Sequence, residues 1–239
     1  MHEARPSVGF WELLGDGERA ALRARSRETA FHRGMTLCLE GDPSTHLFIL
    51  LSGWTKVVSG TMEGHEIVLA LRGPGDVVGE RAGDLDGYRT ATVRALMRVE
   101  ALIVLAERFT AFLDGHPGAV RAYRRAMTER QREVDDNRRD RMESSGAQHL
   151  ARLLLLLALR CGEATEQGVT LAVPLSQADL ASWVGVSRAT VTRALRQWRQ
   201  RGVVSTRHGH VTITDVAALR RLGRLGRVGR TGEGGPGGD

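Results

Sequence analysis

Cysteine, lysine and aromatic residues are all scarce in this chain of 239 residues. The two cysteines, Cys38 and Cys161, lie far apart and form no CxxC motif or cysteine–histidine cluster. This spacing argues against a disulfide framework and against a thiolate-bound metal. Lys56 is the only lysine, so arginine carries almost all of the positive charge.

Long apolar runs are also missing. The longest, residues 150–159, contains Arg152 and is too short to cross a bilayer. The N-terminus lacks the basic, apolar and small-residue pattern of a signal peptide. The chain shows no Ser/His/Asp arrangement, no ATPase-type phosphate loop and no cluster of metal ligands. We therefore expect a cytoplasmic protein that is not an enzyme, requires no cofactor and contacts no membrane.

Positive charge is concentrated in the C-terminal part of the chain. Residues 147–239 hold 13 arginines and 6 acidic residues, a net charge of +7. Residues 1–146 hold 21 basic and 22 acidic residues, a net charge of −1. Because the phosphate backbone of a nucleic acid attracts such a basic region, the asymmetry indicates a nucleic-acid partner for the C-terminal part.

Residues 175–198 predict two short helices joined by a tight turn, the helix-turn-helix pattern. Ser176 and Ser187 are suitable N-caps for the two helices, and Gly185 provides the positive φ that the turn needs. Apolar residues at helical spacing give the second helix a buried face. Its opposite face carries Arg188, Thr190, Thr192, Arg193, Arg196 and Arg199. An ordinary helical hairpin with a solvated basic face is the alternative.

Residues 28–105 have a different pattern, in which short apolar runs alternate with glycine-bearing turns. This pattern predicts an antiparallel barrel or a jelly roll. At one break, Gly79 and Glu80 lie on one side and Arg89 and Thr90 on the other. Arginine and hydroxyl groups bind phosphate oxygens, and glutamate accepts from ribose hydroxyls, so the break is suited to a sugar-phosphate. A structural salt bridge between Glu80 and Arg89 is the alternative.

Residues 117–142 predict one long helix with a narrow apolar stripe of the kind that forms dimer interfaces. The stripe consists of Val120, Tyr123, Met127 and Val134, and it is continued by Arg130, Asn137 and Arg141. A helix that packs along the barrel of its own chain is the alternative. The small polar residues at 144–146 predict a hinge. A short amphipathic helix is expected at residues 9–24.

The remaining C-terminal segments complete a second domain. Residues 148–160 predict a strongly apolar helix, residues 162–168 a loop, and residues 169–176 a short strand. Residues 203–214 predict a β-hairpin that turns at His208 and Gly209, and Asp215 is expected to cap a small last helix. This hairpin corresponds to the wing of a winged helix. The glycine-rich residues 223–239 predict a disordered tail.

In this order, the segments resemble the Crp/Fnr family of bacterial transcription regulators over residues 9–222. The motif GERAGDLDGYRTATV is similar to the family's phosphate-binding cassette, and SRATVTRAL to its recognition helix. The resemblance implies an α+β fold with a cyclic-nucleotide-binding-type β jelly roll, a long dimerisation helix and a C-terminal winged helix-turn-helix. It assigns residues 9–116 to a sensor domain, 117–143 to the dimer helix and 144–222 to the DNA-binding domain.

The resemblance also implies partners and site residues. Cyclic AMP or cyclic GMP would be the effector: Glu80 would hold the ribose 2′-hydroxyl, and Arg89 with Thr90 the cyclic phosphate. Gly79 would offer backbone groups, and Asp135 would reach the ligand from the long helix. A homodimer would bind double-stranded DNA and contact RNA polymerase. The implied DNA-binding residues are Ser176 and Ser187 at phosphates, Arg188 and Arg193 at guanines, and Gln177, Ala189, Thr190 and Thr192 beside them.

Three departures from the family pattern bear on specificity. Residues 81–83, Arg-Ala-Gly, follow Glu80 where cyclic-AMP-binding members carry apolar residues. Val134 and Asp135 align with a Thr–Ser pair that holds adenine in those members. Ala189 stands where many members have a glutamate that accepts from a cytosine amine. Since a methyl group cannot accept a hydrogen bond, we expect relaxed readout or a thymine-methyl contact at that base pair.

Two other functions stay open. The first is a DNA-binding regulator of the same type that responds to another effector, haem included, or to none. The second is a nucleotide-binding module whose helical end docks a protein instead of DNA.

Overall fold

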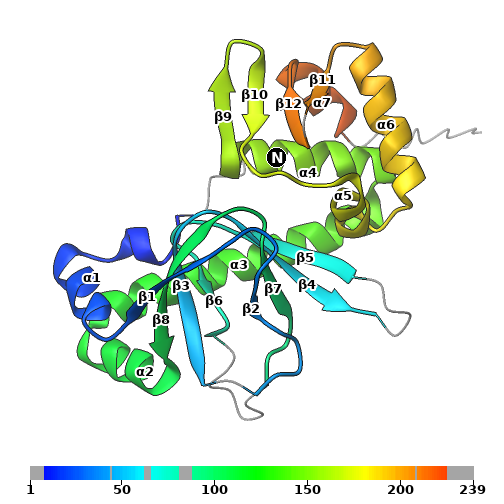
Figure 1. Ribbon diagram of the computed structural model, residues 1–239. Coiled ribbons are helices and arrows are strands. Elements are labelled where there is room, and N and C mark those ends of the chain that lie inside the picture. Colours follow the sequence, from blue (N-terminus) through cyan, green and yellow to red (C-terminus); the bar gives the residue numbers. More distant parts are fainter. Residues whose placement is uncertain (1–7, 44, 62–65, 81–87, 208, 225–239) are drawn as a thin grey trace, which may run out of the picture.

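The computed structural model describes residues 8–43, 45–61, 66–80, 88–207 and 209–224. A β-rich N-terminal part and a smaller C-terminal part lie on the same long helix (Figure 1). The mixed helix and sheet architecture agrees with the predicted α+β class. None of the helices in the described ranges is long and apolar enough to cross a membrane.

The N-terminal part contains two four-stranded antiparallel sheets that form the predicted jelly roll. The first sheet is β1 (Arg27–Phe31), β8 (Val99–Leu105), β3 (His46–Ser52) and β6 (Val77–Val78), in that order. The second is β2 (Thr36–Cys38), β7 (Thr92–Ala95), β4 (Thr55–Gly60) and β5 (Glu66–Arg72). Side chains from both sheets, including Phe48 and Val93, form one buried cluster between them. The alternating apolar pattern of the strands supplies this core.

The segment at residues 9–24 is two short helices where one was predicted. They are η1 (Trp11–Leu13) and α1 (Asp16–Arg23). Leu14 between them is extended, with ψ of 143°, and Gly15 serves as the N-cap of α1. Phe10, Leu14 and Leu22 are buried. The break lets Phe10 reach Phe109 on α2 (Ala106–Gly115), with ring centroids 5.8 Å apart.

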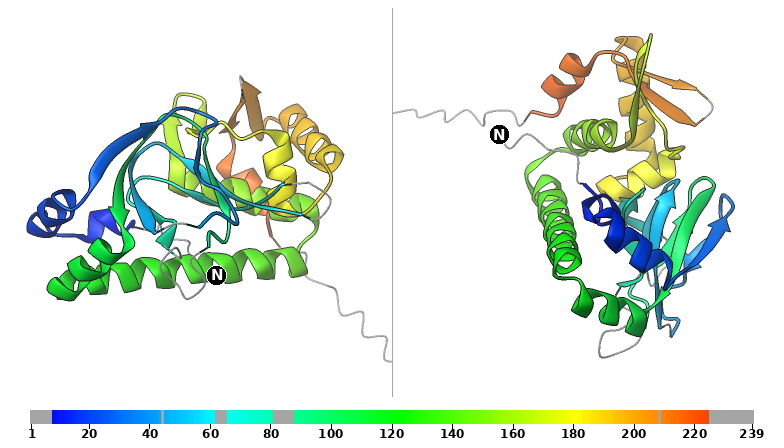
Figure 2. Two further views of the ribbon diagram at one scale, coloured as in Figure 1. Left: turned by 60° about the horizontal axis from the view of Figure 1, so that its bottom comes forward. Right: turned by 90° about the vertical axis from the view of Figure 1, so that its left-hand side faces the viewer.

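Helix α3 (Pro117–Glu143) runs along the N-terminal part and reaches the C-terminal part (Figure 2). Much of its predicted dimer stripe packs inside the chain. Tyr123 joins the N-terminal core. Asn137 Oδ1 lies 3.0 Å from His149 Nε2, and Arg141 donates to the Trp183 carbonyl at 2.5 Å. At these positions α3 therefore packs against its own chain, which was the alternative to a dimer interface. Val134, in contrast, is 48% exposed.

The C-terminal part has the predicted winged helix-turn-helix order. Its helices are α4 (Gly146–Cys161), α5 (Gln177–Val184), α6 (Arg188–Gln200) and α7 (Val216–Leu222). Its sheet contains β11 (Val204–Arg207), β12 (His210–Ile213), β10 (Gly168–Leu171) and β9 (Gly162–Thr165), in that order. The prediction of a loop at residues 162–168 is therefore wrong in part, because Gly162–Thr165 forms a strand that pairs with β10. Alternating polarity is too weak over four exposed residues to signal a strand.

Several predictions fall outside the described residues. They concern Arg81, Ala82 and Gly83 of the cassette, His208 at the tip of the wing, and residues 225–239 of the predicted tail. The first two residues of that tail are described and bound: Arg152 Nε donates to the Gly223 carbonyl at 2.6 Å, and Gln148 Nε2 to the Arg224 carbonyl at 2.8 Å.

The two parts share one apolar core. Val58, Val68, Leu71 and Leu96 of the jelly roll belong to the same buried cluster as α4, α5 and α6. Trp54 packs against this cluster, and the guanidinium of Arg160 lies over the Trp54 ring at 5.8 Å. The C-terminal part therefore packs directly on β4 and β5.

Candidate functional sites

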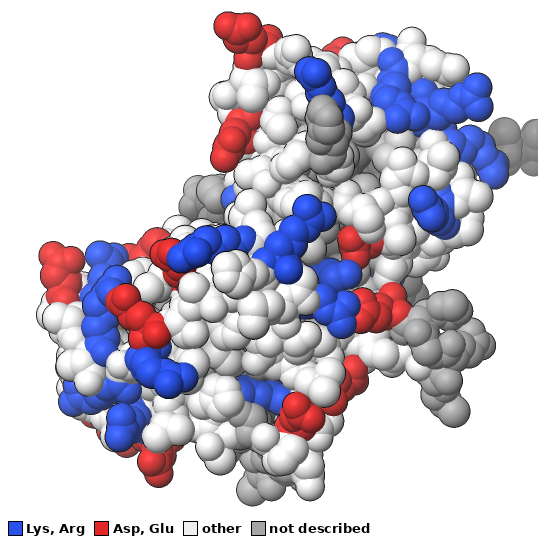
Figure 3. All heavy atoms as spheres, viewed as in Figure 1, with Lys and Arg blue, Asp and Glu red and all other residues white. Residues whose placement is uncertain are grey.

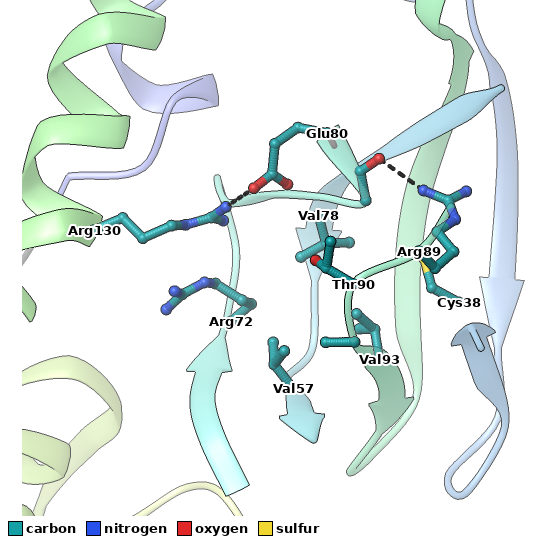
Figure 4. A pocket seen from close by; sticks show the side chains of 11 residues that line it. Cys38, Val57, Arg72, Val78, Glu80, Arg89, Thr90, Val93 and Arg130 are labelled. Carbon is teal, nitrogen blue, oxygen red and sulfur yellow. Dashed lines mark hydrogen bonds and ion pairs between the residues drawn. The ribbon is translucent and has the colours of Figure 1, made fainter. Parts of the chain in front are cut away.

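A cavity among the described residues lies between the second sheet and α3. It has a volume of about 480 Å³, including the part open to solvent, and is lined by Cys38, Val57, Arg72, Val78, Gly79, Glu80, Arg89, Thr90, Ala91, Val93 and Arg130. Four of the five predicted nucleotide-binding residues, Gly79, Glu80, Arg89 and Thr90, meet here (Figure 4).

Arg89 is buried, with 5% of its surface exposed, and Nη1 donates to the Gly79 carbonyl at 2.7 Å. Gly79 has φ of 76°, and a Cβ at this position would collide with Nη1 of Arg89. Glycine is therefore required here for two reasons, the left-handed backbone and the close approach of the guanidinium. The contact holds the Arg89 side chain at one end of the cavity.

Glu80 forms its ion pair with Arg130 on α3, and the predicted alternative of a Glu80–Arg89 bridge is not what the structure shows. Arg130 also donates to the Val77 carbonyl. The side chains of Glu80 and Arg130 are 17% and 19% exposed, respectively. An arginine from the long helix thus closes the cavity opposite Arg89.

Arg72 is a second lining arginine that the sequence interpretation missed. It ends β5, is 6% exposed, and donates through Nη1 to the Leu71 carbonyl at 2.8 Å and to Glu133 Oε2 at 3.0 Å. Burial lowers the pKa of Arg72, as does the nearby charge of Arg130, while Glu133 opposes both. One signal was available: Arg72 is a lone charge at the end of an apolar strand.

The Arg72–Glu133 pair is extended by contacts to α4 of the C-terminal part. Arg160, in the last turn of α4, donates to the other Glu133 oxygen at 2.6 Å and lies 3.4 Å from Asp76 Oδ2. Alternating charges therefore run from the cavity wall through α3 to α4. Each charge in this series of contacts has a partner of opposite sign, as burial requires.

The cysteines and the described histidines do not make a metal or redox centre. Burial raises the pKa of the Cys38 thiol to about 11, and that of Cys161 to about 11 as well. Both thiols are therefore protonated and unreactive near neutral pH. Within the described ranges, no three His, Cys, Asp or Glu side chains gather as a metal site would need.

Asp135, the fifth predicted effector residue, does not line this cavity in the single chain. It lies exposed on α3 and accepts from Gln131 Nε2 at 3.1 Å. Its predicted contact with a ligand stays a prediction.

The helix-turn-helix has the predicted caps. Ser176 Oγ accepts from the Asp179 amide at 3.0 Å, and Ser187 Oγ from the Thr190 amide at 3.2 Å. Gly185 has φ of 79°, which permits the turn between α5 and α6. Val191, Leu195 and Trp198 are buried, so the opposite side of α6 faces solvent.

The exposed face of α6 carries the predicted DNA-binding side chains Arg188, Ala189, Thr192 and Arg193, together with Arg196. Figure 3 shows basic side chains gathered on this side of the molecule. Thr192 Oγ1 donates to Gln177 Oε1 at 2.6 Å and links the two helices. None of Arg188, Arg193 and Arg196 forms an ion pair with a described residue. Their charges are therefore available to an anionic partner.

A polar contact fixes α5 on the jelly roll. Lys56 Nζ lies 2.7 Å from Asp179 Oδ1, and the side chains are 13% and 14% exposed. Ser182 Oγ donates to the Glu66 carbonyl at 2.8 Å and accepts from the Val68 amide at 2.9 Å. Burial raises the pKa of the Asp179 carboxyl, but hydrogen bonds from Lys56 and Ser176 outweigh burial and leave that pKa below its ordinary value.

Comparison with known proteins agrees with this division. A family model of the cyclic nucleotide-binding domain matches residues 28–116, and one of the Crp-like helix-turn-helix domain matches residues 148–222. A CRP-like cAMP-activated global transcriptional regulator of Mycobacterium tuberculosis is 30% identical over 223 residues, which cover 92% of this chain and 99% of that protein. The cyclic AMP receptor protein of Thermus thermophilus is 28% identical over 192 residues, 80% of this chain and 86% of that protein.

Solved structures show the same fold. A CRP-family transcriptional regulator from Thermus thermophilus superposes with a TM-score of 0.71 at 25% identity, over 82% of this chain and 96% of the other. A CooA mutant from Carboxydothermus hydrogenoformans gives a TM-score of 0.75 at 18% identity, over 92% and 98% of the chains. At 18% identity, the similarity to the CooA mutant concerns the fold alone.

Proposed function

This chain belongs to the Crp/Fnr family of transcription regulators, and from that premise we propose that it is a homodimer whose binding to DNA is controlled by a cyclic nucleotide in the cavity. Sensing is assigned to residues 9–116, dimer formation to 117–143 and DNA binding to 144–222. Val134 and Met142, 48% and 81% exposed on α3, are available to a second copy.

The observation that carries the proposal is the arrangement of Arg89, Thr90 and Glu80 around one cavity. Arg89 and the Thr90 hydroxyl would bind the cyclic phosphate, because a buried guanidinium forms strong charge-assisted hydrogen bonds with phosphate oxygens. Glu80 would accept from the ribose 2′-hydroxyl. The named relatives from Mycobacterium tuberculosis and Thermus thermophilus support a nucleotide of this class, since cyclic AMP appears in both of their names.

Control of DNA binding would pass through α3 and α4. A sugar hydroxyl at Glu80 competes with Arg130 for the same carboxylate. Any shift of Arg130 acts on α3, and Glu133 on that helix contacts Arg160 of α4. A ligand shifts the domain equilibrium only as far as it binds one arrangement better than another. The Glu80–Arg130 pair is the element whose strength a bound nucleotide changes.

At the output end, α6 would enter a major groove. Arg188 and Arg193 would read guanines, and Ser176, Gln177, Ser187 and Thr190 would lie near phosphates at the helix N-termini. Two copies would bind half-sites about one helical turn apart. Contact with RNA polymerase belongs to the same proposal.

Titration calorimetry with cAMP and cGMP, combined with fluorescence anisotropy on a duplex selected from random DNA, tests the proposal. We expect binding of at least one nucleotide, tighter DNA binding in its presence, and loss of both effects in Arg89→Ala. Arg94→Ala is the matched control, because Arg94 lies on β7 outside the cavity and pairs with Glu66. Unchanged nucleotide affinity in Arg89→Ala would contradict the assignment.

A second candidate is the same DNA-binding regulator without a cyclic nucleotide. The observation in its favour is that Arg89 and Glu80 already have partners in the chain, Gly79 and Arg130. In that case the two pairs are structural, and DNA binding is constitutive or depends on another effector. Wild-type protein that binds its selected duplex but neither nucleotide would support this candidate.

A further inference from the structure

The cavity has arginine side chains at both of its ends. Arg89 lies at one end, Arg72 and Arg130 at the end next to α3, and Glu80 and Thr90 between them (Figure 4). Val57, Val78 and Val93 line the intervening wall. This arrangement fits a bound nucleotide whose phosphate lies at Arg89, whose ribose lies at Glu80 and whose base lies beside Arg72.

Arg72 keeps donor capacity that the chain does not use. A guanidinium has five N–H groups, and only Nη1 of Arg72 donates to described residues. Nε and Nη2 have no acceptor among them. Neither nitrogen is sealed from water, because the only sealed side-chain atoms without a partner in the described ranges belong to Glu129 and Ser144. These N–H groups therefore need water or a ligand as acceptor.

The α3 end of the cavity offers donors and almost no acceptors. Its polar lining side chains are Arg72, Arg130 and Glu80, and the Glu80 carboxylate is paired with Arg130. Glu133 beside them is bound on both oxygens, by Arg72 and Arg160. A base that presents an amine here would face mainly donors, whereas a base with acceptors would satisfy the buried guanidinium.

The two purines differ in this respect. On its Hoogsteen edge guanine presents two adjacent acceptors, O6 and N7, which arginine contacts with two hydrogen bonds. Adenine presents N7 beside an amino group, which is a donor. Against a buried guanidinium, adenine leaves donors facing donors, and such a mismatch costs more than a missing contact.

We propose that the cavity selects guanine over adenine and that Arg72 is the residue that makes the selection. The inference rests on the proposed function, since it assumes that a cyclic nucleotide binds with its phosphate at Arg89. It assigns to Arg72 a role in base specificity that is separate from phosphate binding. The same planar donor geometry would accept hypoxanthine, which also has O6 and N7.

Titration calorimetry on the full chain with cGMP, cAMP and the inosine analogue of cGMP tests this inference. We expect cGMP and the inosine analogue to bind about tenfold or more tightly than cAMP. Arg72→Met, which keeps the length of the side chain without donors, should bring the three affinities to within about twofold of one another. Arg94→Met is the control and should keep the wild-type ratio.

Arg72→Lys provides a second variant, because lysine keeps the charge that pairs with Glu133 but loses the planar fork. It should bind cGMP with a reduced preference over cAMP, even if Arg72→Met does not fold. Equal or tighter binding of cAMP by the wild type, or an unchanged ratio in the folded Arg72 variants, would overturn the inference and leave the proposed function standing. Absence of binding for all three nucleotides would overturn both.

Discussion

Arginine has opposite surroundings in the two functional regions of this molecule. In the cavity, Arg72 and Arg89 are only 6% and 5% exposed, and each is held by a carbonyl or a carboxylate. On α6, Arg188 and Arg193 are exposed and form no ion pair with described residues. The buried arginines have fixed geometry and suit recognition of one small ligand. The exposed ones provide a field that attracts any polyanion, and specificity there depends on which base edges they reach.

The largest expected effect separates the two regions by their response to salt. Raising salt from about 50 to 200 mM should weaken binding of the protein to a selected duplex about 10³-fold, because counterions are released from every neutralised phosphate. Nucleotide affinity should change by less than about threefold, since buried pairs are poorly screened. Fluorescence anisotropy measures the affinity for the duplex, and calorimetry measures the affinity for the nucleotide, across the same salt series. Duplex binding that is absent or insensitive to salt would favour a protein partner for α6.

The next effect concerns single residues of the exposed region. Arg188→Ala should weaken binding to the selected site by about 1–3 kcal/mol and relax one base position, because a bidentate contact to guanine is lost. Arg33→Ala, which changes an exposed arginine of the N-terminal part, is the control. Anisotropy on the selected and on random duplexes decides the matter: equal losses on both would show that Arg188 contacts only phosphate. Binding-site selection with Ala189→Glu should also yield a changed half-site.

The smallest effect is expected at the contact that joins the two regions. Lys56→Met should lower the free energy of unfolding by about 1.5 kcal/mol, because it removes a hydrogen bond to the charged Asp179 carboxylate. Arg98→Met should change it little, since the Arg98–Glu100 pair is mostly exposed, at 64% and 52%. Denaturant titration at neutral pH measures both variants.

The same contact predicts a dependence on pH. The pKa of Asp179 lies below its ordinary value of 3.8 in the folded chain, so its contribution to stability is present above that pH and is lost as the pH falls through the lowered pKa. In Lys56→Met, burial acts without the ammonium group and this acid-side loss should shrink. The free energy of unfolding of the wild type and of Lys56→Met, measured between neutral pH and pH 3, tests this prediction. The same pH dependence in both proteins would contradict the assignment.

Much of the fold follows from local patterns in the sequence. Glycine turns between short apolar runs predicted the jelly roll. Ser176, Gly185 and Ser187 located the starts of both helices of the helix-turn-helix and the turn between them at their observed positions. Each of these features depends on a few neighbouring residues and can therefore be recognised in the sequence itself. The four exposed residues of β9 lack such a pattern, and only pairing with β10 makes them a strand.

The exposed arginines of α6 were likewise evident from the sequence alone, since a helix with one apolar face must present its other face to solvent. The neighbours of the buried arginines were not. Glu80 meets Arg130 from 50 positions away, and Lys56 meets Asp179 from 123 positions away. Arg72, which we propose selects the base, takes its role from Glu133 and the cavity beside it. Contacts at such separations depend on how the jelly roll, α3 and α4 pack together, and only the tertiary structure decides them.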